Sequence, residues 1–252
     1  MNSLSSAAIL NRRKGSVAAA DDPPMPEDSL EWATVSSSTT KVLAGIKTVS
    51  YDEDTRNLFA THKGGGVLLW SWKAGKFDTF LEADKDKNDM IHAVFCVGNF
   101  LWVSMGKGKI VIYDVETLKT VTKVVAHTAE VFCMVKIRGS GSAAKVLTGS
   151  IDFVVKIWDE DAMLVSHSSH HHGAVLCAIQ VRDPTASGDG NPQIWTGSND
   201  GTVFKWIDDN SDGKVNKEEG TILKHSTSEA VTCLEQVERY IWAGTERGKL
   251  VI

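Results

Sequence analysis

The 252-residue sequence lacks a long hydrophobic run, because no stretch reaches the roughly eighteen apolar residues that a membrane-spanning helix needs. We therefore expect no membrane span. The chain also lacks a surplus of basic residues, since its formal net charge is -5 at pH 7. A protein that neutralises nucleic-acid phosphates needs such a surplus, so we expect no nucleic acid among its partners. Other proteins or peptides are the partners that this composition favours.

Catalytic motifs are missing as well. The sequence has no Gly-x-Ser-x-Gly nucleophile motif, no phosphate loop of the Gly-x-x-x-x-Gly-Lys type and no His-Glu-x-x-His metalloprotease motif. No pair of acidic residues is forced together by its spacing for acid–base chemistry. We predict that the chain has no catalytic residues, that it is not an enzyme, and that it has no small-molecule substrate.

Proline is scarce, with 5 residues against 21 glycines. Three of these prolines stand among the acids of residues 21–28, a composition typical of a linker. We predict that residues 1–28 are a disordered N-terminal arm and linker, although the Ser, Ala and basic residues of this arm also fit an organellar transit peptide. In the remainder, many glycines and a hydrophobic content of 42% predict tight turns around a buried core.

Residues 29–252 repeat one unit about five times. Each unit has a short apolar segment of the type Val-x-Cys, a second short apolar segment, a hairpin turn, and a third segment that ends in an aromatic residue. The first segments are residues 42–44, with Ala in place of Cys, 94–96, 131–133, 175–177 and 231–233. The second segments are residues 58–61, 101–104, 146–149, 194–197 and 241–244. The aromatic residues are Trp70, Tyr113, Trp158 and Trp206, at a spacing of about 45 residues.

Short β-rich segments with turn signals, a repeat length in the forties and no helical pattern are typical of propeller blades. We predict an all-β fold, a β-propeller of four-stranded antiparallel blades with about five blades. The blades are expected at residues 41–84, 90–124, 127–168, 171–225 and 228–252. Either residues 30–35 supply an outer strand that closes a five-bladed ring, or the ring is incomplete and the chain is the front portion of a longer protein, which we favour.

Two of the units resemble the WD40-repeat family. Their motifs are Gly-Ser-Ile-Asp at 149–152 followed by Lys-Ile-Trp-Asp at 156–159, and Gly-Ser-Asn-Asp at 197–200 followed by Lys-Trp at 205–206. In that family a His, a Ser or Thr, an Asp and the Trp form a hydrogen-bonded set that fixes each blade. The resemblance implies one network of His127, Thr148 or Ser150, Asp152 and Trp158. It implies a second network of His171, Thr196 or Ser198, Asp200 and Trp206.

The other units depart from this set. Lys107 and Arg247 stand at the Asp position, and Met90 and Thr227 stand where the His is expected. We therefore expect these blades to depend more on packing.

The resemblance to WD40 proteins implies a rigid platform that binds other proteins, as a scaffold or adaptor without catalytic activity. A second hypothesis is the N-terminal regulatory propeller of a larger signalling enzyme, truncated here, because the Ile-Trp-Thr-Gly-Ser repeats resemble the propellers that precede inositol polyphosphate 5-phosphatase domains. The partner-binding face is expected at the hairpin turns. It would carry Lys107, Lys109, Phe153, Asn199, Glu246 and Arg247. This set mixes both signs of charge and names no partner.

Residues 208–219 match the EF-hand calcium loop at every constrained position. The ligands would be Asp208, Asn210, Asp212, the carbonyl of Lys214, and Glu219. Strand-like flanks replace the usual helices, so we predict weak binding of Ca²⁺ with the first three as the principal ligands. The alternative is a solvated hairpin in which acids and glycine serve turn formation.

The cysteines and histidines have simpler explanations than a metal site. The alignment gives each of the four cysteines the same place in a different first strand, and rotation about the propeller axis then keeps them too far apart for disulfides or a shared metal. We expect small thiols packed between blades in a cytoplasmic protein.

A cluster of four histidines could hold a transition metal; its members are His167, His170, His171 and His172. Adjacent histidines cannot all face one ion, so we expect an inter-blade loop there instead.

Overall fold

The computed structural model describes residues 45–52, 56–62, 65–71, 76–81, 90–137, 144–181, 193–207 and 229–252. By its internal contacts the chain divides into two units, Met1–Ser38 and Thr39–Ile252. The first unit, which includes the predicted arm and linker, lies outside the described residues. All elements described below belong to the second unit.

The regular elements of the described residues are all β-strands, and no helix there could cross a membrane. The strands form five antiparallel sheets, called blades 1 to 5 in chain order. Blade 1 contains β1 (Ile46–Tyr51), β2 (Asn57–His62), β3 (Val67–Ser71) and β4 (Lys76–Leu81). Blade 2 contains β5 (Val94–Val97), β6 (Phe100–Met105), β7 (Lys109–Asp114) and β8 (Thr120–Val125). Blade 3 contains β9 (Val131–Ile137), β10 (Lys145–Ser150), β11 (Val155–Trp158) and β12 (Leu164–Ser168).

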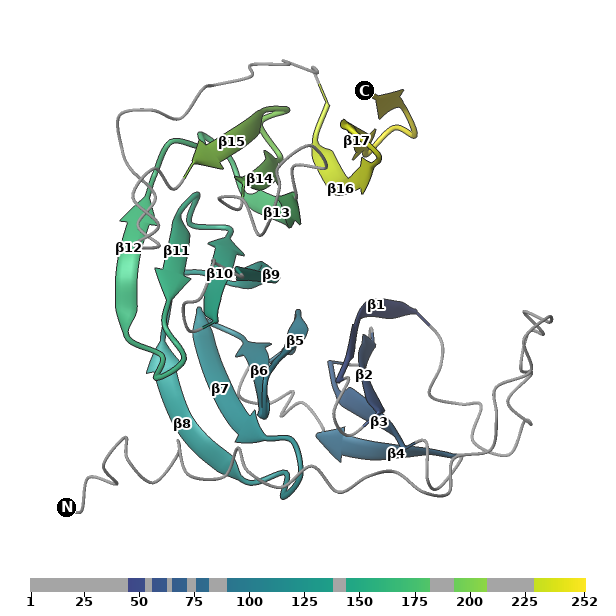
Figure 1. Ribbon diagram of the computed structural model, residues 1–252, viewed down its shortest axis with the longest axis vertical. Coiled ribbons are helices and arrows are strands. Elements are labelled where there is room, and N and C mark those ends of the chain that lie inside the picture. Colours follow the sequence, from purple (N-terminus) through teal and green to yellow (C-terminus); the bar gives the residue numbers. More distant parts are fainter. Residues whose placement is uncertain are drawn as a thin grey trace. The chain divides into compact units, whose positions relative to one another are not determined.

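Blades 4 and 5 each show three strands within the described residues. Blade 4 contains β13 (Val175–Val181), β14 (Gln193–Ser198) and β15 (Val203–Ile207). Blade 5 contains β16 (Val231–Val237), β17 (Tyr240–Thr245) and β18 (Leu250–Val251). Within every blade the strands pair in sequence order, and the five sheets follow one another in a ring, from the purple β1–β4 to the yellow β16–β18 (Figure 1). The predicted all-β propeller of five blades is confirmed.

The strand sequences reflect two buried faces on each blade. A propeller blade packs against a neighbour on both sides, so its middle strands are apolar almost continuously, as in β6 and β7 of blade 2. In the outer strand β8, valines are mixed with threonines and a lysine, and most of its residues are exposed. Neighbouring blades contact one another through their first strands, β1 with β5, β5 with β9, β9 with β13, and β13 with β16.

The register of the second and third strands confirms the predicted repeat. Each of the four aromatic residues pairs with the first residue of the second apolar segment of its unit. The pairs are Trp70 with Leu58, Tyr113 with Leu101, Trp158 with Val146, and Trp206 with Ile194. The aromatic residues therefore occupy one structural position in four successive blades.

The register of the first strands corrects the predicted alignment of blade 2. Cys133, Cys177 and Cys233 each pair with the glycine of the second strand, so these three cysteines are equivalent. Cys96 instead pairs with Leu101 and lies further along its strand. The counterpart of the three cysteines is Ala93, whose carbonyl accepts a hydrogen bond from the backbone of Ser104 at the glycine position (2.9 Å). The prediction that all four cysteines are equivalent was therefore wrong for Cys96.

A similar correction applies to blade 1. Its first strand is Ile46–Tyr51 and not residues 42–44, which lie outside the described residues. The predicted register of the first strands was wrong because both faces of these strands are buried. The spacing of apolar residues alone then does not specify which residue pairs with which. A β-bulge follows the first pair of the strand in four blades, between residues 46 and 48, 131 and 133, 175 and 177, and 231 and 233.

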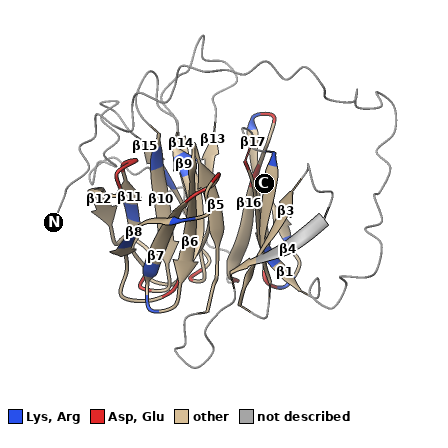
Figure 2. Cartoon of the chain, turned by 90° about the horizontal axis from the view of Figure 1, so that it is seen from below, with Lys and Arg blue, Asp and Glu red and all other residues tan. Residues whose placement is uncertain are grey.

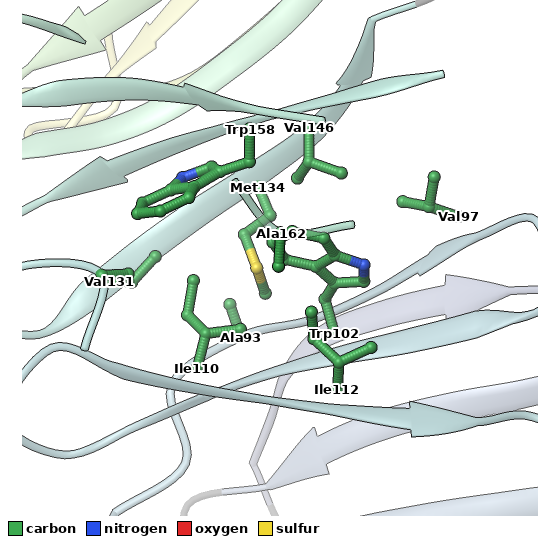
Figure 3. Packing of buried hydrophobic residues seen from close by; sticks show 11 residues of the cluster. Ala93, Val97, Trp102, Ile110, Ile112, Val131, Met134, Val146, Trp158 and Ala162 are labelled. Carbon is green, nitrogen blue, oxygen red and sulfur yellow. The ribbon is translucent and has the colours of Figure 1, made fainter. Parts of the chain in front are cut away.

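The core consists of apolar layers between neighbouring blades. Figure 3 shows the layer between blades 2 and 3, where Trp102 and Ile112 of blade 2 meet Met134, Val146 and Trp158 of blade 3. Trp102 is 1% exposed and Val146 is fully buried. Burying one such large side chain contributes about 1.5–3 kcal/mol to folding, so these layers hold neighbouring blades together.

Glycines in the second strands allow the blades to approach closely. A Cβ atom at Gly149 would lie 2.6 Å from Cγ1 of Val175, and one at Gly197 would lie 2.6 Å from Cγ1 of Val231. Both distances are far below van der Waals contact, so the valine of one blade fills a notch that only glycine leaves open in the blade before it. At Gly244, a Cβ would approach only the Sγ atom of Cys233 in its own blade.

We predict that Gly197→Ala lowers the free energy of unfolding by about 1–3 kcal/mol, because the added methyl group overpacks the notch that receives Val231. Gly244→Ala is the matched control, since only the thiol of the exposed Cys233 must rotate away. Urea denaturation followed by tryptophan fluorescence measures both variants. Equal losses at the two positions would show that the notch does not hold blades 4 and 5 together.

Candidate functional site: the face of the hairpin turns

The turns between the second and third strands share one geometry in four blades, whereas in blade 2 both Lys107 and Gly108 have a positive φ. In blades 1, 3, 4 and 5 the amide of the fourth turn residue donates to the carbonyl of the first. These bonds are Gly65 N to His62 O (2.8 Å), Phe153 N to Ser150 O (3.2 Å), Gly201 N to Ser198 O (3.1 Å) and Gly248 N to Thr245 O (3.0 Å). The fourth residue has a positive φ each time, which defines a three-residue hairpin loop with a left-handed last residue. We call the surface formed by turns 62–65, 105–108, 150–153, 198–201 and 245–248 the turn face.

Backbone hydrogen bonds fix three of these turns to the segment that precedes the first strand of the same blade. The amides of Ile151, Asn199 and Glu246 occupy equivalent positions. They donate to the carbonyls of Glu130 (3.0 Å), Ala174 (2.8 Å) and Ala230 (2.9 Å), respectively. The turn face is therefore built on a rigid base in blades 3, 4 and 5.

The structure places all six residues of the predicted partner-binding face on or beside these turns, and all six are exposed. Lys107 and Lys109 belong to the turn of blade 2, Phe153 to blade 3, and Asn199 to blade 4. Glu246 and Arg247 belong to the turn of blade 5. Among the described residues, Figure 2 shows Lys and Arg interspersed with Asp and Glu.

The hydrogen-bond network of blade 3 lies directly beneath its turn. Nε2 of His127 is 2.8 Å from Oγ1 of Thr148, which also accepts from Nε1 of Trp158 (2.9 Å). Nδ1 of His127 is 3.0 Å from Oδ2 of Asp152 in the turn. Thr148, and not Ser150, therefore supplies the hydroxyl of this set. Ser150 instead donates to the carbonyl of Ala129 (3.2 Å) and accepts from the amide of Asp152 (3.1 Å).

The network of blade 4 contains an additional member. Thr196 again joins Nε2 of His171 (2.8 Å) to Nε1 of Trp206 (2.8 Å). Nδ1 of His171 is 3.9 Å from Asp200, too far for a hydrogen bond, and is 3.1 Å from Oγ1 of Thr202. Thr202 in turn donates to Oδ1 of Asp200 (2.5 Å). Thr202 was not predicted from the sequence, although a hydroxyl residue two positions after the turn Asp was a visible signal.

The direction of donation along both networks follows from their ends. The tryptophan Nε1 can only donate and the ionised aspartate can only accept. In blade 3, the hydroxyl of Thr148 therefore donates to Nε2 of His127, and the Nδ1–H of His127 donates to Asp152. In blade 4, Nδ1–H of His171 donates to Thr202. Both imidazoles therefore carry a proton on Nδ1, and in the neutral form their Nε2 accepts from the threonine hydroxyl.

Burial explains the ionisation of these histidines. Burial lowers the pKa of His171 to about 4, although the charge of Asp200 raises it. Burial likewise lowers the pKa of His127, partly offset by Asp152. For Asp152, burial acts to raise the pKa, but hydrogen bonds from the amides of Thr128 and Val154 and from His127 outweigh it and hold that pKa below its usual value. Each network therefore joins a neutral histidine to an anchored carboxylate.

Blade 5 uses a different polar contact at the same end. Oε2 of Glu229 accepts from Oγ1 of Thr245 (2.7 Å), and its Oε1 is 2.5 Å from Nζ of Lys249. The pKa of Glu229 is lowered by these hydrogen bonds from Lys249 and Thr245. The equivalent positions in blades 3 and 4 are Ala129 and Gly173, so this contact replaces the family network and was not predicted from the sequence.

No group of three or more potential metal ligands occurs among the described residues. The candidate calcium ligands Asp208, Asn210, Asp212, Lys214 and Glu219 lie outside them, in the stretch that follows β15. In the histidine cluster, His171 belongs to the blade network, while Nδ1 of His170 is 2.5 Å from Ser168 and its ring lies against Trp206. His167 and His172 are exposed.

The first strands of blades 3 to 5 line an open hollow of ≈ 400 Å³. It is bordered by Val135, Ile179, Gln180, Glu235 and Gln236.

No protein-family model and no curated protein matches the sequence. Solved structures are similar in fold. The designed protein Ika4 aligns with TM-score 0.52 and 17% identity over 65% of this chain and 89% of that chain. The designed protein Ika8 aligns with TM-score 0.58 and 16% identity over 81% of this chain and 57% of that chain. A chain of a mitotic checkpoint complex aligns with TM-score 0.61 and 18% identity over 89% of this chain and 68% of that chain. These identities show a shared fold alone.

We predict that acid destabilises the protein through its buried histidines. The unfolded chain binds a proton at His171 near pH 6.5, whereas the folded chain does so only near pH 4. Stability is therefore complete above pH 6.5 and falls as the pH is lowered through this window, by about 3 kcal/mol for this residue. Urea midpoints between pH 7 and pH 4.5 measure the slope. His171→Gln should reduce it, and an unchanged slope in this variant would contradict the assignment.

Thr196→Val should lower the free energy of unfolding by about 2–4 kcal/mol. The change keeps the shape of the side chain but leaves Nε1 of Trp206 and Nε2 of His171 buried without partners. Thr232→Val is the control, because its exposed hydroxyl donates to the carbonyl of Gly244 (3.2 Å), and it should change stability by less than about 0.5 kcal/mol. Thermal and urea denaturation measure both. A small loss for Thr196→Val would show that the network contributes little.

Proposed function

We propose that this protein is a non-catalytic scaffold or adaptor of the WD40-repeat type, which binds other proteins or peptides on its turn face. The observation that carries the proposal is that the turn face combines exposed side chains with a fixed backbone. Phe153, Asn199, Glu246 and Arg247 are exposed on the turns of blades 3, 4 and 5, whose backbones are held by hydrogen bonds to the preceding segment. Lys107 and Lys109 are exposed on and beside the turn of blade 2. A rigid surface loses little conformational entropy when a partner binds, which favours recognition.

The blade networks support the WD40 assignment. In blades 3 and 4 a buried histidine, a threonine and the tryptophan of the third strand are joined as the family resemblance implies, and the turn aspartate anchors the far side of the histidine. The function of these groups within the proposal is structural. They set the height and orientation of the turns and take no part in chemistry.

The cysteines support a reducing, cytoplasmic location within the same proposal. Cys96, Cys133, Cys177 and Cys233 are all free. Free thiols persist in the reducing conditions of the cytosol. Weak Ca²⁺ binding by residues 208–219 and the regulatory role beside a signalling enzyme stay predictions.

The turn face is tested by paired charge reversals in the full chain. Lys107→Glu with Arg247→Glu changes two exposed residues on the turn face, whereas Lys119→Glu with Arg239→Glu makes the same charge change at the opposite strand ends, next to Asp114 and Tyr240. We expect the first double variant to lose proteins that the wild type captures from cell extract, as measured by quantitative mass spectrometry. The second double variant should retain them. Identical recovery by all three proteins would place binding elsewhere.

A further inference from the structure

The last residue of the hairpin turn is left-handed in every blade. Its φ is 83° at Gly65, 68° at Gly108, 70° at Phe153, 80° at Gly201 and 79° at Gly248. Four blades use glycine, the residue that adopts this conformation without steric cost. Blade 3 alone uses a bulky aromatic residue there, although the same turn geometry is satisfied by glycine elsewhere in the ring.

Phe153 gains no burial that would account for this choice. Its side chain is 44% exposed, and it stands on the turn face and not within an inter-blade layer. A positive φ also occurs at non-glycine residues elsewhere in the chain, at Arg56, Lys107, Leu118, Ala162 and Glu238. What distinguishes Phe153 is that a large aromatic ring is left exposed at a turn position that costs conformational energy. The observation therefore points to a contact made outside this chain.

The backbone on both sides of Phe153 is fixed. The amide of Phe153 donates to Ser150, and the next amide, of Val154, donates to Oδ1 of Asp152 (3.1 Å). Asp152 is itself held by His127 and by the amide of Thr128 (3.0 Å). The ring of Phe153 is thus presented at a set place and direction by the network beneath it, as a preorganised anchor would be.

The charges around Phe153 select the chemistry of the partner. Asp152 already accepts hydrogen bonds from three residues of its own blade, and half-buried Glu130 lies near His92. Exposed Lys107 lies on the neighbouring turn, where the carbonyl of Gly108 accepts from the amide of His127 (3.0 Å). The turn of the neighbouring blade therefore carries an exposed cation.

We propose that Phe153 is the anchor of a binding site for an extended peptide segment that carries an apolar residue next to an acidic one. The apolar residue packs on the Phe153 ring, and the carboxylate pairs with Lys107. This inference rests on the proposed function and names the partner class of the same face. An aromatic anchor beside a complementary charge is the usual composition of an interaction hot spot.

The experiment selects a random-peptide library displayed on phage against the full chain and measures the recovered peptides by fluorescence anisotropy. We expect enrichment of an apolar residue beside Asp or Glu. Phe153→Gly should weaken the recovered peptide by more than about tenfold, and Lys107→Glu should weaken it in a salt-dependent way. Tyr240→Gly is the matched control, because Tyr240 is equally exposed, at 45%, but starts β17 at the other strand end, and it should leave binding unchanged.

Stability separates a binding role from a structural one. Because glycine relieves the left-handed strain, the melting temperature of Phe153→Gly should equal that of the wild type or exceed it by up to about 4 °C. A lower melting temperature would make Phe153 a structural residue and overturn the inference. The inference is overturned if Phe153→Gly binds the recovered peptides as well as the wild type does while Arg247→Glu no longer binds them. The proposed function would still stand in that case.

Three further outcomes also decide the matter. A basic consensus would overturn the acidic partner. Self-association abolished by Phe153→Gly would identify a second copy of this chain as the occupant, again against the inference. The absence of any enriched peptide would overturn the inference and also count against the turn face as a binding surface.

Discussion

The contact between a valine and the notch above a glycine sets how closely blades 3, 4 and 5 approach one another. Val175 and Val231, both fully buried, enter the notches at Gly149 and Gly197 of the preceding blades. The first strands of blades 4 and 5 are thereby brought close enough for apolar layers to form against the blades before them. The turns that these blades present at the surface are positioned by this step, which occurs twice in the chain.

The buried networks transmit this placement to the turn face. Trp158 belongs to an inter-blade layer, and its Nε1 bonds Thr148, which bonds His127, which bonds Asp152 in the turn. The chain of hydrogen bonds thus extends from the hydrophobic core to the exposed loop within a single blade. Blade 4 lengthens this chain by one hydroxyl, and blade 5 replaces it by a carboxylate and an ammonium group, so the same end can be fixed by different chemistry.

The sequence predicted the elements better than their register. Aromatic residues at regular spacing located the third strands, and the two complete motifs located the networks of blades 3 and 4. The Val-Phe-Cys at residues 94–96 copies the pattern of residues 131–133 but lies three positions out of register, and a pattern of apolar residues does not reveal such a slip. Glu229 escaped prediction because its role depends on backbone approach across a turn, which residue spacing alone does not specify. Thr202 stands two positions after the turn aspartate, so its signal was present in the sequence.

The cysteines of successive blades differ in chemical accessibility although three of them share one structural position. Burial raises the pKa of Cys96 and of Cys133 to about 12 and also raises that of Cys177, so these thiols stay protonated. Cys233 is exposed, on a face of blade 5 that no other described blade covers at Gly244. Because the thiolate is the reactive form, an alkylating fluorophore would attach first at Cys233. The wild-type chain thus offers a natural position for a spectroscopic reporter.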